Sequence, residues 1–152
     1  MAAGTFTKFA KNLDRLSIND LVAAGAKIAL VTNSWTPDPS VTGNSLWADM
    51  SANEIAAANG YGAGGIALSS LVATAISGGF KVSSASPVWT ASGGSIAAWR
   101  YGVLYVPATL WSRVNPVIGY FLGDAAPADV PATTTGNTLT LTVPAGGWFD
   151  LT

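Results

Sequence analysis

The chain has 152 residues, a net charge of −1 and a charged fraction of only 10%, while 49% of its residues are hydrophobic. This length fits one domain, residues 1–152, with a sizeable core, and the 7 scattered basic residues exclude the concentrated basic face of a nucleic-acid groove. The absence of Cys and His from the sequence excludes disulfides, thiolate or imidazole metal ligands, and Ser-His-Asp or Cys-His catalysis.

Residues 1–20 are predicted to form an amphipathic N-terminal segment. Four apolar residues in this segment recur at helical spacing: Phe6, Phe9, Leu13 and Leu16. Two interpretations stay open for such a helix, because it either covers one end of a sheet or acts as an arm that docks on a neighbouring subunit. The segment lacks the continuous apolar run of a secretory signal, so we expect none there.

Residues 27–32 form a compact, β-branched run that predicts a buried strand. Residues 33–45 are rich in Pro, Asp, Gly and Asn, which is typical of a surface loop. Trp35 in this loop is either a plug buried beneath it or an exposed contact residue. Residues 46–50 then fit a short strand.

Ser51 and Glu54 have the spacing of a capping box, which predicts a short helix over residues 52–58. Asn59 and Gly60 would end that helix, since both tolerate a left-handed backbone. Residues 60–65 match the glycine spacing of a dinucleotide-binding loop, but a predicted helix precedes them, a predicted strand follows and the ribose-binding acid is missing. We therefore expect no nucleotide cofactor.

From residue 64 onward the chain is typical of short strands separated by glycine turns. The predicted strands span residues 66–71, 73–76, 80–83, 88–90, 96–107, 116–122, 138–143 and 148–151. A helix is an alternative for residues 66–76, and residues 124–135 fit an extended surface connection. The pattern predicts a mainly β, antiparallel β-sandwich or jelly-roll-like domain with one or two short helices near its N-terminal half.

The acidic residues offer little support for an enzyme or a metal site. Residues 55–123 contain no Asp or Glu at all. Asp49 with Asp124 is a conceivable glycosidase pair, and Asp124 with Asp129 a conceivable calcium site, but neither pair has a recognisable motif. We favour turn and cap roles for these carboxylates, and predict no catalytic, cofactor-binding or metal-binding residue.

The low charge admits two interpretations. Ordinary globular domains carry about 25% charged residues, well above the 10% of this chain. Either partners cover much of this surface, or the chain is a soluble monomer coated in Ser, Thr and Gly. The uncharged run over residues 55–80 is interrupted by glycines, asparagines and serines, so we expect no membrane span.

Large rings are frequent, with 6 Trp, 4 Tyr and 5 Phe. Rings in strands usually pack in cores or interfaces, whereas exposed rings beside a cation stack on sugars or bases. Trp111, two residues before Arg113, is the best candidate for an exposed contact ring. A carbohydrate-binding module is therefore one functional hypothesis.

Six sequence segments, in order, resemble a family of small virion structural proteins of tailed phages and prophages. They are KIALVT at 27–32, ADMSANE at 48–54, GYGAGG at 60–65, WTASGGSI at 89–96, RYGVLY at 100–105 and PVIGY at 116–120.

This resemblance implies a capsid decoration or cement protein that is made in the bacterial host cytoplasm and sits on the outer head surface. The expected partner is the major capsid protein or another virion protein, and the expected assembly is a homo-oligomer, a dimer or a trimer. A tail, collar or adhesin component is the alternative within the same family. The residues that we expect to contact a partner are Phe6, Phe9, Leu13, Trp35, Trp111 and Arg113.

Overall fold

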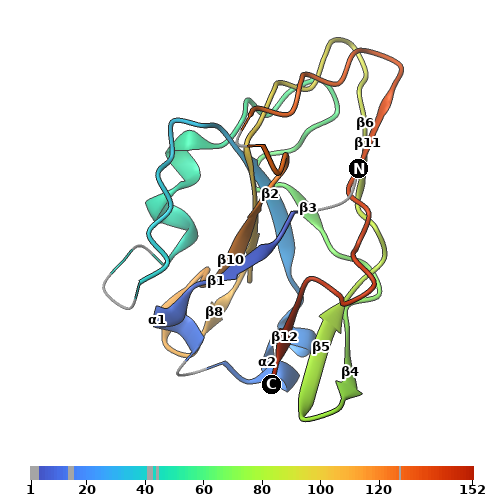
Figure 1. The fold of residues 1–152 in the computed structure, drawn as a ribbon. Coiled ribbons are helices and arrows are strands. Elements are labelled where there is room, and N and C mark those ends of the chain that lie inside the picture. The colour runs from blue at the N-terminus through green and yellow to red at the C-terminus, as the bar shows by residue number, and fades with distance from the viewer. Residues whose placement is uncertain (1–3, 14–15, 41–42, 44, 127) are drawn as a thin grey trace.

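A five-stranded antiparallel sheet forms the centre of the computed structural model, which describes residues 4–13, 16–40, 43, 45–126 and 128–152 (Figure 1). Its strands, in spatial order, are β1 (Phe6–Lys8), β10 (Val117–Leu122), β7 (Tyr101–Tyr105), β2 (Lys27–Val31) and β3 (Ile66–Ala67). The middle strand, β7, pairs along its whole length with both β10 and β2.

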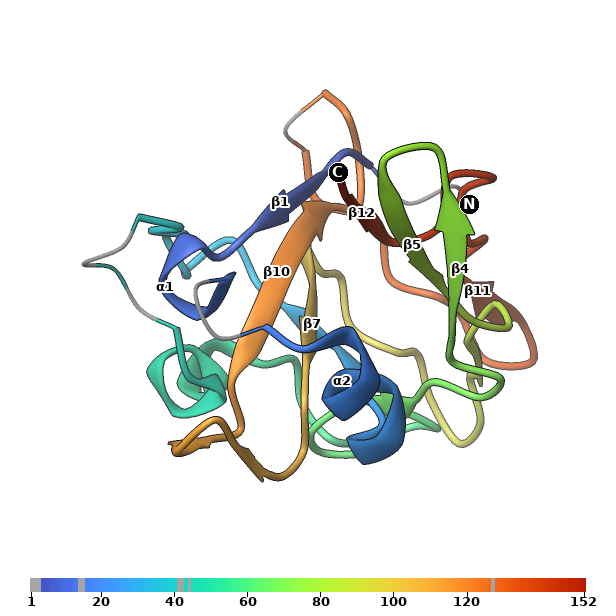
Figure 2. The ribbon, with the colours of Figure 1, turned by 90° about the horizontal axis from the view of Figure 1, so that it is seen from below.

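A second layer of strands lies beside this sheet, as Figure 2 shows. It contains a three-stranded sheet and a two-stranded sheet, while a separate hairpin lies near the bottom of the first sheet (Figure 1). In order, these are β12 (Phe149–Leu151), β5 (Gly79–Ser83) and β4 (Val72–Ile76); β11 (Thr138–Thr140) and β6 (Val88–Thr90); and β8 (Thr109–Leu110) with β9 (Arg113–Val114). All of these pairs are antiparallel.

The chain is 37% strand and 11% helix, so it is mainly β and sandwich-like, as the sequence predicts. The observed strand order gives no support for a jelly roll. The two layers meet where β1 lies near β12: the Phe6 and Phe149 rings stack at 5.4 Å, and Lys8 Nζ donates to the Asp150 carbonyl oxygen at 2.9 Å. No helix within the described ranges is long and apolar enough to cross a membrane.

The central sheet is buried on both faces. Along β2, Ile28 and Leu30 pack into the main core between the two layers, while Ala29 and Val31 pack into a second core on the opposite face. All four side chains are fully buried. A strand with two buried faces reads as a continuous apolar run, which explains why residues 27–32 predicted this strand so well.

Loops and short helices cover the second core. Phe9, Trp35, Trp47 and Met50 supply its large side chains. They come from the chain before α1 (Ala10–Leu13), the loop after β2, the 3-10 helix η1 (Trp47–Asp49) and the residue between η1 and the 3-10 helix η2 (Ser51–Asn53). Trp35 is therefore the buried plug that was one of its two interpretations, at 4% exposure.

The predicted helix from Phe6 to Leu16 is wrong. Phe6 lies on β1 and packs against the main core, whereas Phe9 is buried in the second core on the other side of the sheet. A helix stripe cannot send its residues to two faces of a sheet, and the free edge of β10 offers β1 backbone partners that a helix would leave unused. Only the single turn of α1 is helical, and residues 14–15 lie outside the described residues.

The predicted strand at 46–50 and the predicted helix at 52–58 are also wrong, because two 3-10 turns occupy this segment. Their polar side chains bond elsewhere. Asp49 Oδ2 accepts hydrogen bonds from the backbone nitrogens of Ser45 and Leu46, at 3.0 and 2.9 Å. The Glu54 carboxylate reaches forward to Tyr61 instead of back to Ser51, so no capping box forms.

Helix α2 (Ile18–Ala24) was not predicted from the sequence. Its N-cap is Ser17, whose Oγ accepts from the Asp20 backbone nitrogen at 3.4 Å, and only Leu21 is buried. A single buried position produces no helical spacing of apolar residues, so the N-cap residue Ser17 was the only sign of this helix in the sequence.

The strands predicted after residue 64 are largely confirmed. The exceptions are 66–71, where β3 has two residues and the alternative helix is also wrong, 96–107, where the regular strand begins at Tyr101, and 138–143, where β11 ends at Thr140. The short strands β8 and β9 were not predicted.

Glycines allow large rings to lie flat on the central sheet. Gly102 on β7 is directly opposite Phe121 on β10, and a Cβ added at Gly102 would lie 2.2 Å from Phe121 Cζ. A bulge between Val117 and Gly119 reverses the alternation of β10, so that Tyr120 faces the second core and Phe121 the main core.

We predict that Gly102→Ala lowers the free energy of unfolding by about 1–3 kcal/mol, because the new methyl group overpacks the ring of Phe121. Gly146→Ala is the matched control, since a Cβ at Gly146 has nothing within 4 Å. Urea unfolding followed by tryptophan fluorescence measures both. Equal stability of the two variants would contradict this packing.

Candidate partner-binding surface

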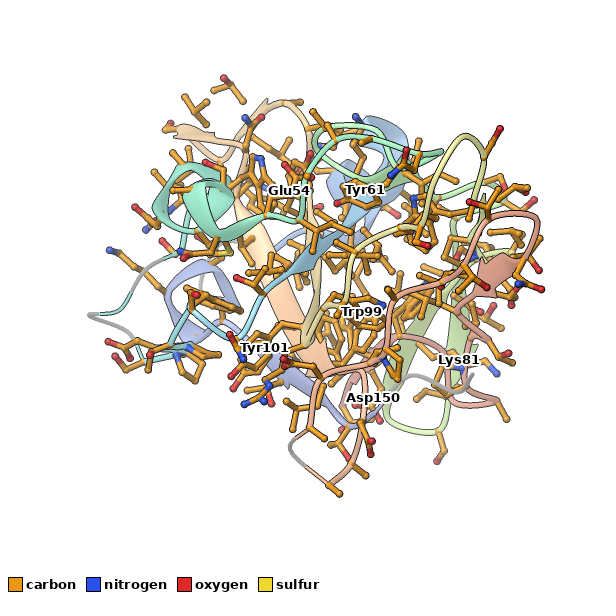
Figure 3. The ribbon with its side chains drawn as sticks, turned by 90° about the horizontal axis from the view of Figure 1, so that it is seen from above. Glu54, Tyr61, Lys81, Trp99, Tyr101 and Asp150 are labelled. Atoms are coloured by element: carbon orange, nitrogen blue, oxygen red, sulfur yellow. The ribbon has the colours of Figure 1, made fainter. Side chains whose placement is uncertain are left out.

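The titratable groups nearest the core form a hydrogen-bonded cluster around Glu54 (Figure 3). Glu54 Oε1 accepts from the Tyr61 hydroxyl and from the Gly64 backbone nitrogen, each at 2.7 Å. The Tyr61 hydroxyl also accepts from the Leu30 backbone nitrogen at 2.9 Å, and the Tyr105 hydroxyl donates to the Gly64 carbonyl oxygen at 2.8 Å. The cluster therefore fastens residues 54–64 to strands β2 and β7.

Both phenols of this cluster are held in their protonated form. Burial raises the pKa of Tyr105 to about 12, and the charge of Glu54 adds to the effect. Burial also raises the pKa of Tyr61, with the neighbouring Glu54 contributing in the same direction. At neutral pH the two hydroxyls thus act as hydrogen-bonding groups that hold the loop.

The other carboxylates considered from the sequence have structural contacts. Asp129 Oδ1 accepts from Arg100 Nε at 2.8 Å and its Oδ2 accepts from Asn33 Nδ2 at 3.0 Å. Asp124 Oδ1 accepts from the Ala126 backbone nitrogen at 3.0 Å, as in a turn. Within the part of the chain that the structure describes, no group of three or more His, Cys, Asp or Glu could hold a metal ion.

The raised pKa of Tyr105 predicts a loss of stability at high pH. In the unfolded chain this phenol ionises near pH 10, whereas in the folded chain it keeps its proton to about pH 12. Between these values the unfolded state binds fewer protons, so the free energy of unfolding falls as the pH rises.

We expect this fall to be less steep in Tyr105→Phe than in the wild type, when urea unfolding is measured from pH 9 to pH 12. The same slope in both proteins would show that Tyr105 titrates alike in the folded and unfolded states.

The β8–β9 hairpin is the most unusual backbone segment of the described chain. Its turn residues, Trp111 and Ser112, both have positive φ, at 53° and 60°, and Asn115 follows at 48°. Two-residue hairpin turns need this left-handed conformation but normally use Asn and Gly for it. For Trp and Ser each such residue costs about 1–2 kcal/mol, so contacts elsewhere must hold the turn.

Four contacts hold the hairpin in place. The Trp111 ring packs against the main core, and its Nε1 donates to Asp20 Oδ2 on α2 at 3.3 Å. Arg113 Nη1 donates to Ser45 Oγ at 3.4 Å, while its buried Nε has no hydrogen-bond partner among the residues that the structure describes. The Asn115 backbone nitrogen donates to the Ala108 carbonyl oxygen at 3.0 Å and closes the base of the hairpin.

The hairpin presents apolar surface to solvent. Val114 is 60% exposed, the highest value among the large hydrophobic residues that the structure describes. Trp111 and Arg113 beside it are partly buried. We call Trp111, Arg113 and Val114 the hairpin surface. The first two were expected contact residues, whereas Val114 was missed because a two-residue strand carries no alternation to mark its exposed face.

The remaining expected contact residues lie elsewhere. Phe9 is fully buried and Trp35 is 4% exposed, so in this conformation neither ring can touch a partner. Phe6 is partly buried at the junction of the two layers. Leu13 ends α1, and its side chain lies outside the described part of the structure. The structure therefore brings together only Trp111 and Arg113.

The aromatic rings are mostly internal. Trp35, Trp47, Trp89, Trp99 and Trp148 are all buried, with exposures of 9% or less, which leaves Trp111 as the one partly exposed tryptophan. A flat platform for stacking on sugars needs several exposed rings, so this distribution gives little support to the carbohydrate-binding hypothesis.

No protein-family model, curated protein or solved structure matches this chain.

We predict that Ser112→Gly raises the free energy of unfolding by about 1 kcal/mol, because glycine adopts positive φ without the steric cost that serine bears. Ser77→Gly is the control, since Ser77 is also a hairpin turn residue but is not among the residues with positive φ. Chemical denaturation compares the two. Destabilisation of both variants would show that the left-handed turn is not strained.

Proposed function

We propose that this chain is a phage virion structural protein, and specifically a decoration or cement protein that binds the outer head shell as a small homo-oligomer. Its partner would be the major capsid protein. The observation that carries the proposal is the hairpin surface, an exposed apolar element kept in a costly backbone conformation by contacts with α2 and the core. Strained exposed elements of this kind occur preferentially at functional sites.

Two further properties support a binding role. The charged fraction of 10% leaves few ions to desolvate when the surface is covered by another protein. Val114 directly follows Arg113 and lies three residues after Trp111, and tryptophan and arginine are among the side chains that contribute most often to binding energy at protein interfaces.

A decoration protein of this kind acts by mass action. A subunit that binds the assembled lattice, and not its separated capsomers, adds its binding free energy to the stability of the shell. At a free concentration one hundred times the dissociation constant, each site contributes about 2.7 kcal/mol. This mechanism needs a complementary surface and no reacting group.

The test is co-sedimentation of the purified protein with expanded heads of the phage that encodes it. We expect the wild type to bind, and Val114→Asp to bind at least about tenfold more weakly, because a buried charge replaces an apolar contact. Val88→Asp is the matched control, since Val88 is also an exposed strand valine, at 44%, but lies on β6 away from the hairpin.

Three other results would each support a different binding surface or a different function. Equal binding by both aspartate variants would remove the hairpin surface from the interface. Binding of the wild type to tails but not to heads would identify a tail or adhesin component. Glycan-dependent changes in tryptophan fluorescence without particle binding would favour a carbohydrate-binding module.

A further inference from the structure

Strand β4 is the outer edge of the three-stranded sheet, whose order is β12, β5, β4 (Figure 2). Its five residues, VATAI, include no charge and no proline. Soluble proteins usually protect an edge strand with lysine, proline, a bulge or a covering segment, because an open edge is a template for another strand. None of these devices is present on β4, whose register with β5 is regular over all five residues.

Alternate residues of β4 direct their backbone groups to opposite sides. The β4–β5 hairpin closes with the pair Ile76 and Gly79. In an antiparallel ladder every second pair exchanges backbone hydrogen bonds, so Ile76, Thr74 and Val72 bond to β5. The N–H and C=O groups of Ala73 and Ala75 therefore point to the open edge. Among the described residues, none forms a backbone hydrogen bond to these groups from outside the sheet.

Helix α2 covers a face of this sheet and leaves its edge open. Leu16, which precedes α2, and Ile18, its first residue, line a cavity with Ala73, Phe80 and Leu151. These last three residues come from β4, β5 and β12, so the cavity lies over the face that all three strands share.

We propose that β4 pairs antiparallel with β4 of a second copy of this chain, around a two-fold axis at Thr74. In this register Ala73 of each copy lies opposite Ala75 of the other. Each such pair exchanges two N–H to C=O bonds, so four backbone hydrogen bonds form, and all the outward groups of Ala73 and Ala75 are used. The result is a continuous six-stranded sheet across the dimer.

The side chains of β4 suit this self-pairing. Thr74 lies opposite Thr74 of the second copy, and Val72, which is 48% exposed, lies opposite Ile76. Threonine pairs and β-branched pairs are favourable across antiparallel strands. The two-fold axis at Thr74 places this residue against its own copy, so a charge there would repel itself, and β4 carries none.

The nearest cation does not oppose the dimer. Lys81 on β5 is paired with Thr74 in the register, and its Nζ donates to the Ala145 carbonyl oxygen at 3.1 Å. The two copies of Lys81 would be three strand spacings apart, about 14 Å, which exceeds the distance over which surface charges interact at physiological salt.

Sedimentation velocity over a concentration series tests this dimer with the full chain. The wild type should dimerise, and Thr74→Glu should dimerise at least about tenfold more weakly, because two carboxylates then face each other. Thr74→Glu should still fold, since Lys81 opposite it is a favourable partner within the chain. Thr138→Glu, at an exposed strand position on β11, is the control and should dimerise like the wild type.

A charge exchange makes the test specific for the register. Thr74→Lys alone should also dimerise at least about tenfold more weakly than the wild type, whereas an equimolar mixture with Thr74→Glu should form a heterodimer. Hydrogen exchange gives a second readout: in the wild type the Ala73 and Ala75 amides should become protected as the concentration rises, while the Thr74 amide is protected throughout.

A wild type that stays monomeric, a dimer that survives Thr74→Glu, or a mixture that fails to associate would each overturn the proposal. The inference deepens the homo-oligomer of the proposed function by naming its surface. Self-association is measured here without phage particles, so its failure is distinguishable from a failure to bind heads.

Discussion

Burial of both faces of the central sheet is the constraint on which the rest of the structure depends. Strands β2 and β7 contribute alternate residues to two separate cores, so each face must be covered by other parts of the chain. The second strand layer covers one face, and loops carrying Trp35 and Trp47 cover the other. Polar groups near these cores must then find partners inside the protein, as Glu54, Tyr61 and Tyr105 do.

Burial of the large aromatic rings in the two cores determines which apolar residues remain exposed for contacts with other proteins. Five of the six tryptophans are buried, so the exposed apolar residues that the structure describes are aliphatic side chains and Phe80 on peripheral strands. The hairpin surface and the β4 edge are two such regions. Helix α2 lies near both, because its Asp20 accepts from Trp111 and the residues at its start share a cavity with Ala73. A substitution in α2 that shifts the helix would therefore affect both surfaces.

The candidate contact residues were only partly predictable. Trp111 and Arg113 were expected from a ring and a cation in a connecting segment, and both lie on the hairpin surface. Phe9 and Trp35 looked equally available in the sequence, but pairing of β1 with β10 and folding of the loop over β2 bury them. Val114 and the β4 edge depend on which side of a strand is left uncovered, and this is a property of the sheet order.

Local patterns were enough to predict the mainly β class and the positions of most strands, because apolar runs and glycine turns are encoded within a few residues. The low charge of the chain left two interpretations open, a surface covered by partners or a monomer coated in Ser, Thr and Gly, and both stay predictions. Only the tertiary structure decided that Phe6–Lys8 is a strand, that the segment around Ser51 forms 3-10 turns and that β4 is an edge. Each of these depends on hydrogen bonds or burial supplied by residues far away in the chain, which no local pattern encodes.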